Sequence, residues 1–266
     1  MKIVIFKGGL GNQLFQFGQY CNLISKGYKV KALNFCTDHN GFELEKYFNA
    51  KLDFIKSRLC SRFFMCLVKL PSFIRRNIII DRFKYSENRF AVFYNDFWQS
   101  KMFLPKGDWI KFQEMPLNEN NTKTVNDIMR CNSVALHIRR GDYLKAGCSE
   151  LFTNLCETDY YKTSIDFIKK QVQNPSFYVF SNDIDWCRNN LDIENCTYVD
   201  WNTGNDSVYD MYVMSKCKYV IIANSTFSFW GAYLNKRAKI VIYPRNWYNG
   251  FKDNTLDIFP ANWIIL

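Results

Sequence analysis

The sequence predicts an α/β protein with a parallel, doubly wound sheet, and three observations lead to this prediction. From residue 122 onward, apolar runs of strand length alternate with segments of helical period. The chain also opens on an apolar strand, 2–6, which a glycine-rich turn joins to a helical pattern. Polar clusters follow the ends of the predicted strands, where parallel sheets bind their ligands.

Five strands and five helices are predicted in the second half of the chain. The strands are 133–138, 176–180, 197–199, 219–223 and 239–243. The helices are 124–131, 159–172, 184–191, 208–215 and 227–235. In the second of these helices the residues Tyr161, Ile165, Ile168 and Val172 recur every three or four positions, as an amphipathic helix requires. Strands that alternate with helices in this way pair in parallel through right-handed crossovers.

Two adjacent arginines, Arg139 and Arg140, follow the first of these strands. A guanidinium group stays charged at any working pH and matches phosphate oxygens two at a time. The pair therefore predicts a phosphorylated ligand at the carboxyl edge of the sheet. The alternative is that both arginines pair with internal carboxylates or point into water.

A second polar cluster at this edge begins a predicted helix. It supplies five candidate ligand-binding residues, Asn224, Ser225, Thr226, Phe227 and Ser228. Free backbone N–H groups and the helix dipole attract anions at a helix start, so the segment suits a phosphate. Ordinary N-capping by Ser225 or Thr226 is the alternative, and the two roles are compatible.

Four segments carry a resemblance to a known family. They are GGLGNQLFQ (8–16), HIRRGDY (137–143), FSNDIDW (180–186) and NSTFSFWGAYL (224–234). Together, and in this order, they resemble the bacterial α-1,2-fucosyltransferases of glycosyltransferase family 11. The chain departs from the family pattern at Asn182, where an acidic residue is common, and at Phe229 and Gly231, where Trp and Ala are common. Residues 40–121 carry no such motif.

The resemblance implies a GT-B-like fold, in which two Rossmann-like, doubly wound domains face a central cleft. Residues 1–121 would form the acceptor-side domain, and residues 122–266 would form the domain that binds the nucleotide sugar. The implied reaction moves fucose from GDP-fucose to a galactoside hydroxyl of a glycan, with inversion at the anomeric carbon and with neither metal nor cofactor. Two alternatives stay open: a transferase for another nucleotide-diphosphate sugar, and a non-catalytic nucleotide- or glycan-binding module.

The resemblance also implies roles for residues of the arginine motif. His137 would lie near the nucleotide of the donor, and we assign Arg139 to the β-phosphate, where charge develops as GDP departs. Arg140 either assists it or anchors the loop. Asp142 acts as a general base for the acceptor hydroxyl, or it orients the arginines through an ion pair.

Asp183 is the first of two carboxylates in the third motif, and two ligands suit it. It can accept hydrogen bonds from the N1 and N2 groups of guanine. Asp183 and Asp185 also fit the Asp-x-Asp pattern of metal-dependent sugar-nucleotide enzymes. This pattern is short, however, and Asn182 or Asp183 is placed to cap a helix, so no metal site is predicted.

The glycine-rich turn near the N-terminus differs from a dinucleotide-binding fingerprint. Leu14 occupies the third glycine position, and Asn34, not an acidic residue, follows the second strand at 30–33, so NAD binding is not predicted. We expect the glycines, with Gly11 among them, to let the backbone approach a sugar. Asn12 and Gln13 would then hydrogen-bond to hydroxyls of the fucose or the acceptor. A tight turn with Asn12 as the helix cap is the alternative.

Length and composition agree with a two-domain enzyme. The chain has 266 residues, and its hydrophobic share of 48% and aromatic share of 18% support substantial cores. Its ten cysteines include no CxxC pair, and its two histidines, His39 and His137, disfavour zinc catalysis. The apolar start at 3–6 is too short for a signal peptide, so we expect a cytoplasmic protein with reduced thiols.

The net charge of +10 is concentrated in residues 51–84, a segment that contains nine basic and two acidic residues. Apolar residues recur there at near-helical spacing from Ile55 to Leu70. A basic amphipathic helix of this kind can lie at the anionic inner face of a membrane. The alternative is a helical insertion that covers the N-terminal domain with a solvated basic face. No zinc knuckle, helix-turn-helix signature or basic tail indicates nucleic-acid binding.

Overall fold

The computed structural model describes residues 1–75, 77–81, 91–250 and 257–266. The chain forms two compact units, Met1–Glu114 and Met115–Leu266. The boundary expected from the sequence, after residue 121, falls inside helix α5 (Glu119–Arg130). This helix begins five residues earlier than expected because Asn118 caps it, with its Oδ1 atom accepting from the N–H of Asn121 at 2.8 Å.

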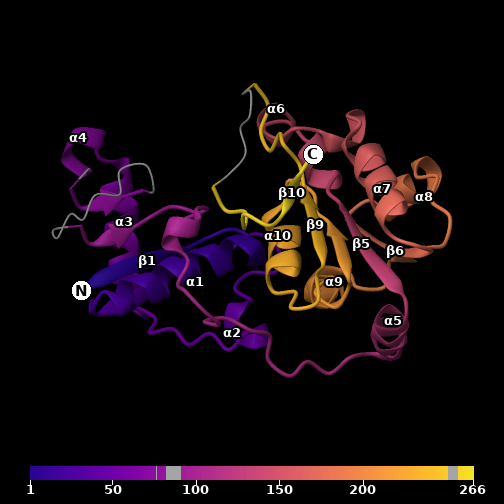
Figure 1. Cartoon of the computed structure of the whole chain (residues 1–266). Coiled ribbons are helices and arrows are strands. Elements are labelled where there is room, and N and C mark those ends of the chain that lie inside the picture. The colour runs from indigo at the N-terminus through magenta and orange to yellow at the C-terminus, as the bar shows by residue number, and fades with distance from the viewer. Residues whose placement is uncertain (76, 82–90, 251–256) are drawn as a thin grey trace. The chain divides into compact units, whose positions relative to one another are not determined.

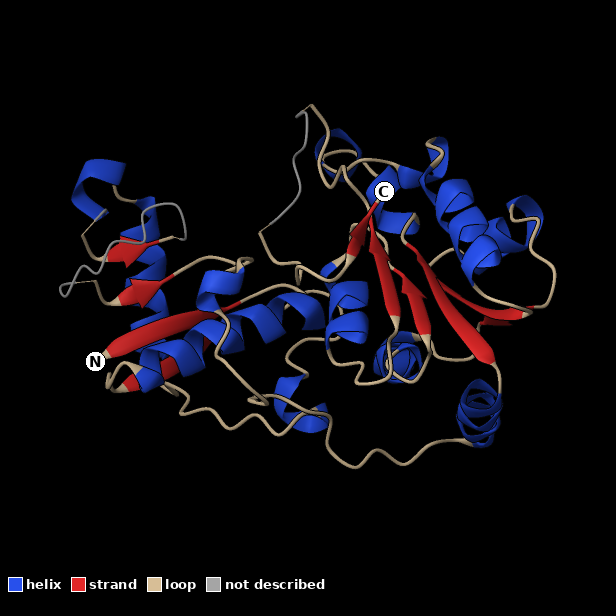
Figure 2. Cartoon of the chain, viewed as in Figure 1, coloured by secondary structure: helices blue, strands red, loops and turns tan. Residues whose placement is uncertain are grey.

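The first unit contains a four-stranded parallel sheet in the order β2-β1-β4-β3 (Figures 1 and 2). Its strands are β1 (Lys2–Phe6), β2 (Val30–Asn34), β3 (Ile79–Ile80) and β4 (Phe93–Tyr94). Strands β1 and β4 pair in parallel in the middle of this sheet, which places the loop after β1 beside the loop after β4. Ligands of parallel sheets bind outside the carboxyl ends of the strands.

Helix α1 (Leu10–Ser25) follows the glycine-rich turn and covers this sheet. Leu14, Phe15 and Leu23 are fully buried, as expected for the apolar face of a packed helix. Three further helices follow in this unit, α2 (Leu44–Tyr47), α3 (Arg58–Lys69) and α4 (Ser72–Arg75). Within the described ranges, the chain has no helix with both the length and the apolar character needed to cross a membrane.

The second unit contains a six-stranded sheet in the order β10-β9-β8-β5-β6-β7, and each neighbouring pair is parallel. The strands are β5 (Asn132–Ile138), β6 (Pro175–Ser181), β7 (Cys196–Val199), β8 (Tyr219–Ile221), β9 (Ile240–Tyr243) and β10 (Ile264–Ile265). The five predicted strands are confirmed to within two residues at each end. Strand β10 was not predicted, because it has two residues and no alternating pattern.

Helices cover both faces of this sheet (Figure 1). They are α6 (Cys148–Leu151), α7 (Tyr160–Gln171), α8 (Ile184–Asn190), α9 (Val208–Met214) and α10 (Thr226–Tyr233), together with α5. On one face, Leu136 and Ile138 of β5 pack with Ile168 of α7 and Cys187 of α8 in a single hydrophobic core. Gly231 allows α10 to pack closely on α9, since a Cβ atom there would lie 3.2 Å from Cε of Met214.

The strand order of the second sheet reverses between β5 and β8. The chain steps outward from β5 through β6 to β7, returns to β8 on the other side of β5, and continues to β9 and β10. The segments after β5 and after β8 therefore meet at the carboxyl edge of the sheet, where a doubly wound fold binds its ligand. The predicted doubly wound α/β class is confirmed, and the arginine motif and α10 lie at this reversal.

Candidate active site

His137 lies near the end of β5, one residue before Ile138 and two before the arginines. Neighbouring residues of a strand point to opposite faces, so His137 points away from the core that Leu136 and Ile138 enter. It is 4% exposed, and its ring centroid lies 5.8 Å from that of Phe227 in the first turn of α10. In the described part of the chain its Nδ1 atom has no hydrogen-bond partner. Burial, and then the charge of Arg139, lower its pKa to about 3, so the imidazole is neutral at working pH.

Arg139 is held by Asp142. Its Nη2 atom lies 2.6 Å from Oδ2 of Asp142, and the two side chains are 23% and 35% exposed. The guanidinium carbon also lies 5.5 Å from the ring centroid of Tyr143. The other carboxylate oxygen of Asp142 accepts from Nδ2 of Asn182 at 3.1 Å. Both oxygens of Asp142 therefore have partners around the arginine loop, as the alternative of an orienting ion pair predicts.

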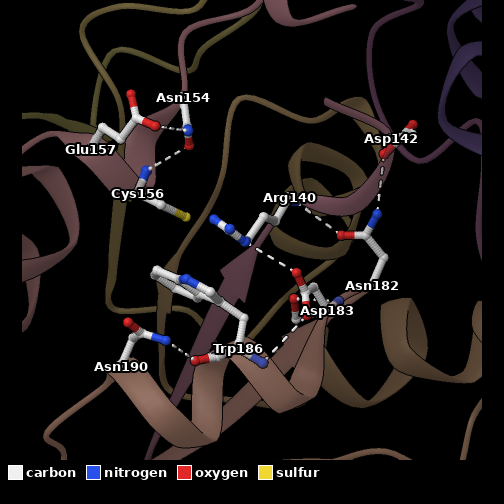
Figure 3. A network of polar contacts seen from close by, with 10 residues as sticks. Arg140, Asp142, Asn154, Cys156, Glu157, Asn182, Asp183, Trp186 and Asn190 are labelled. Atoms are coloured by element: carbon white, nitrogen blue, oxygen red, sulfur yellow. Dashed lines mark hydrogen bonds and ion pairs between the residues drawn. The ribbon is translucent and has the colours of Figure 1, made fainter. Parts of the chain in front are cut away.

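Arg140 is held by the third motif instead (Figure 3). Its Nε atom donates to Oδ2 of Asp183 at 3.1 Å, and its guanidinium carbon lies 4.6 Å from the ring centroid of Trp186. Its backbone N–H donates to Oδ1 of Asn182 at 3.0 Å. The alternative of an internal ion pair thus holds for both arginines, and Arg140 anchors its loop to the start of α8.

Asp183 also caps helix α8, because its Oδ1 atom accepts from the N–H of Trp186 at 3.3 Å. With Oδ2 held by Arg140, both of its oxygens are engaged. Asp185 lies in the first turn of the same helix. Among the residues that the structure describes, no group of three or more His, Cys, Asp or Glu is placed to hold a metal. A guanine edge would have to share Asp183 with Arg140.

The five predicted residues at the start of α10 divide into two sets. Asn224 is 1% exposed, and its Nδ2 atom donates to the carbonyls of Thr153 and Trp247 at 2.9 and 3.0 Å. Ser228 is fully buried, and its Oγ atom donates to the carbonyl of Ser225 at 3.1 Å. Both side chains are used inside the fold, which corrects the prediction that they contact the donor.

Ser225, Thr226 and Phe227 remain at the open end of the helix. Ser225 occupies the N-cap position in an extended conformation, but its hydroxyl makes no capping bond. The first backbone N–H groups of any α-helix have no acceptor within the helix, so this end of α10 can receive an anion. Tyr143 connects the loop after β5 with the loop after β8, because its hydroxyl donates to the carbonyl of Asn224 at 2.9 Å. Arg139 and the start of α10 therefore belong to one connected loop pair.

In the first unit, Gln13 does not have the predicted role. It is fully buried, its Nε2 atom donates to the carbonyls of Gly8 and Gly41 at 3.0 and 2.8 Å, and its Oε1 atom accepts from the N–H of Glu43 at 3.0 Å. A buried amide with three internal hydrogen bonds has no free group for a sugar hydroxyl. Gln13 braces two loops and does not contact a ligand.

Asn12 and Gly11 lie inside α1, which begins at Leu10 with Gly9 as the N-cap, so the alternative of Asn12 as the cap is wrong. The side chain of Asn12 is partly exposed and accepts from Nε2 of Gln99 at 2.9 Å. A Cβ atom on Gly8, whose φ is +76°, would lie 2.9 Å from Nδ2 of Asn12. The first glycine of the turn therefore lets this amide approach the backbone.

Two residues of this turn were missed from the sequence. Gln16 is fully buried and bonds both backbone groups of Lys7, accepting from its N–H and donating to its carbonyl at 3.1 Å each. The Nζ atom of Lys7 donates to Oδ1 of Asn95 at 2.9 Å and so links the loops after β1 and β4. Burial lowers the pKa of Lys7, and Asp96 partly offsets this. The signal was the three-residue spacing of Gln13, Gln16 and Gln19 along a helix rich in apolar residues.

The family model "Glycosyl transferase family 11" matches residues 80–266 of this chain, which include the arginine loop, the Asp183 cap and the start of α10. The chain belongs to glycosyltransferase family 11. The family 11 transferase is 34% identical to an alpha-1,2-colitosyltransferase from Escherichia coli, over 99% of each chain. It is 31% identical to the O-antigen biosynthesis glycosyltransferase WbnK from Escherichia coli, over 97% of this chain and 98% of the relative.

More distant relatives share part of this family 11 transferase. A galactoside alpha-(1,2)-fucosyltransferase 1 from Leontopithecus chrysomelas is 30% identical over 103 residues, 38% of this chain and 28% of that relative. Among solved structures, the NodZ alpha-1,6-fucosyltransferase co-crystallized with GDP matches 88% of this chain and 92% of its own, with 12% identity and a TM-score of 0.50. This likeness confirms the expected GT-B-like fold of a glycosyltransferase.

Proposed function

We propose that this glycosyltransferase is an inverting α-1,2-fucosyltransferase, which moves L-fucose from GDP-fucose to a galactoside hydroxyl of an oligosaccharide or polysaccharide precursor. The observation that carries the proposal is that Arg139, fixed by Asp142, and the start of α10 belong to loops that are hydrogen-bonded to each other at the reversal of the second sheet. This edge offers a guanidinium fork and helix amides to one anion, which suits a diphosphate. Relatives that carry α-1,2 names support the linkage.

In the proposed reaction, this edge of the sheet stabilises the leaving group, GDP. Negative charge grows on the β-phosphate as the bond to the sugar breaks, and donors that are already oriented stabilise that charge most. Asp142 supplies the orientation of Arg139, and the neutral ring of His137 adds a polar surface without a competing charge. The acceptor hydroxyl attacks the opposite face of the sugar, as in inverting glycosidases.

We further propose that turnover requires no metal. The countercharge for the diphosphate comes from Arg139 and from the amino end of α10. The first aspartate of the Asp-x-Asp pattern, Asp183, has other partners than a metal, because it caps α8 and pairs with Arg140.

A second donor is favoured by one specific observation, the 34% identity over the full chain to an alpha-1,2-colitosyltransferase. Colitose differs from fucose by the loss of one ring hydroxyl, at carbon 3. Both donors would present the same diphosphate to Arg139, so the geometry of the arginine loop suits either. The second candidate function is therefore α-1,2-colitosyl transfer from GDP-colitose.

A donor panel separates these functions. The transferase is incubated with a galactoside acceptor and GDP-fucose, GDP-colitose or UDP-galactose, and nucleotide release is followed in time. The linkage of the product is assigned by NMR. We expect an α-1,2-linked product with GDP-fucose and no turnover with UDP-galactose. Turnover with GDP-colitose alone would replace fucose in the proposal, and binding of GDP without any product would leave a non-catalytic module.

A further inference from the structure

Helix α3 has one face packed against the sheet of the first unit. Phe64 and Leu67 are 3% and 7% exposed and join the core that Ile3 and Phe93 form. This face accounts for the attachment of the helix to its unit. Cys60 and Val68 are partly buried and also pack against this core, and the ring centroid of Phe63 lies 6.4 Å from that of Phe93.

A second face of α3 is apolar and exposed. Leu59 and Phe63 are 74% and 58% exposed, and Leu70, directly after the helix, is 37% exposed. These residues are spaced by four and seven positions, which places them on one side of an α-helix. In α4, Phe73 and Ile74 are likewise 68% and 44% exposed. The two helices are linked by Arg75, whose Nη1 atom donates to the carbonyl of Val68 at 2.7 Å.

A cationic row runs beside this apolar stripe. Arg58, Arg62 and Lys69 are exposed and follow the same spacing, displaced by one residue from the apolar positions. No acidic residue lies between Asp53 and Asp81. Arg58 also lies in the first turn, where the helix dipole disfavours a cation. Lys69 lies in the last turn, where the dipole favours a cation, so helix stability explains that charge but not those of Arg58 and Arg62. Of the basic residues in the segment, Arg76, Arg82 and Lys84 lie outside the described residues.

We propose that α3 and α4 dock on an anionic membrane surface, with the apolar stripe at the acyl boundary and the cationic row at the headgroups. Large exposed apolar side chains beside lysine and arginine are the pattern of helices that lie in a membrane interface. A second copy of this chain is a poorer occupant, because a two-fold contact would bring two cationic rows together. An acidic protein would satisfy the charge but leaves five exposed apolar side chains unexplained.

Co-sedimentation with vesicles tests this proposal on the full chain. We expect binding to vesicles of one-third phosphatidylglycerol in phosphatidylcholine, and little binding to phosphatidylcholine alone. Each basic residue near an anionic surface strengthens binding by about five-fold, so Arg58→Gln, Arg62→Gln and Lys69→Gln together should weaken partitioning by roughly 100-fold. Leu59→Ser with Phe73→Ser, which keeps the charge, should also weaken binding.

Two controls show whether vesicle binding depends on this surface and not on the net charge of the protein, and whether the changes leave catalysis intact. The triple change Lys162→Gln, Lys169→Gln and Lys170→Gln removes the same charge from exposed positions of α7 and should leave vesicle binding within about two-fold of the parent. None of these variants should change kcat on a soluble acceptor. Equal loss in both triple variants, binding that ignores lipid charge, or a dimer that the Leu59 and Phe73 changes dissociate would each overturn the proposal.

Discussion

Arg139→Lys tests the assignment of Arg139 to the β-phosphate of the leaving group. The change keeps the positive charge and removes the forked set of guanidinium donors. In the parent chain the Nη2 atom of Arg139 is committed to Asp142 at 2.6 Å and its Nε atom is buried, which leaves the Nη1 group of the same guanidinium for a ligand. Lysine has a single nitrogen at its tip. The carboxylate of Asp142 would hold that nitrogen, so the phosphate would lose its donor.

The expected loss follows from this count of donors. Removal of one oriented donor to a developing charge costs about 10²–10³ in kcat, which corresponds to about 2.7–4 kcal/mol. Because the contact strengthens as GDP departs, kcat and kcat/KM should fall together. Steady-state release of GDP, measured over a range of donor concentrations, gives both constants.

Arg188→Lys is the matched control. Arg188 also pairs with a carboxylate, that of Asp200, but its side chain is 42% exposed on α8. Its replacement should leave kcat close to that of the parent. Near-parental kcat in the Arg139 variant, with a large loss in Arg140→Lys, would refute the reasoning and move the phosphate role to Arg140.

Three further outcomes are expected. Turnover should continue in excess EDTA; a strict requirement for magnesium or manganese that Asp183→Ala abolishes would contradict the metal-free proposal. Gly141→Ala should lower kcat by about ten-fold with little change in Tm, because a Cβ atom there would lie 2.5 Å from Nδ2 of Asn182 and break its hydrogen bonds to Asp142 and Arg140. Burial raises the pKa of Asp210 to about 8. The folded state therefore favours the protonated acid, and Tm should fall as pH rises from about 4 through about 8. Asp210→Asn should flatten that fall in thermal melts at pH 5 and pH 8, and an unchanged slope would contradict this cause.

The sequence was sufficient for the second sheet because its strands are buried apolar runs bounded by polar clusters. Val134, Leu136 and Ile138 are fully buried, as such a run requires. The first sheet was harder to predict. Strands β3 and β4 have two residues each, which is too short for an alternating pattern to be recognised.

Side-chain roles were harder to predict than positions. Residue type and order placed Asn224, Ser228 and Gln13 correctly near the carboxyl ends of the two sheets. They could not show that the amides and the hydroxyl face inward. The same residue type can be buried and brace a loop, or be exposed and bind a sugar. The burial of Gln13 and its three hydrogen bonds decided this point.

The choice between fucose and colitose must be made by side chains that contact the sugar ring. Arg139 and the start of α10 would contact only the diphosphate, which the two donors share. A site built to hydrogen-bond a hydroxyl rejects the analogue that lacks it by about 10⁴–10⁵, whereas a pocket that only leaves room for it discriminates by about 10². The ratio of kcat/KM for the two donors therefore shows whether a side chain of this protein hydrogen-bonds to the hydroxyl that colitose lacks. A ratio near 10⁴ in favour of GDP-fucose requires a buried polar group beside the sugar, and a ratio below about 10² requires none.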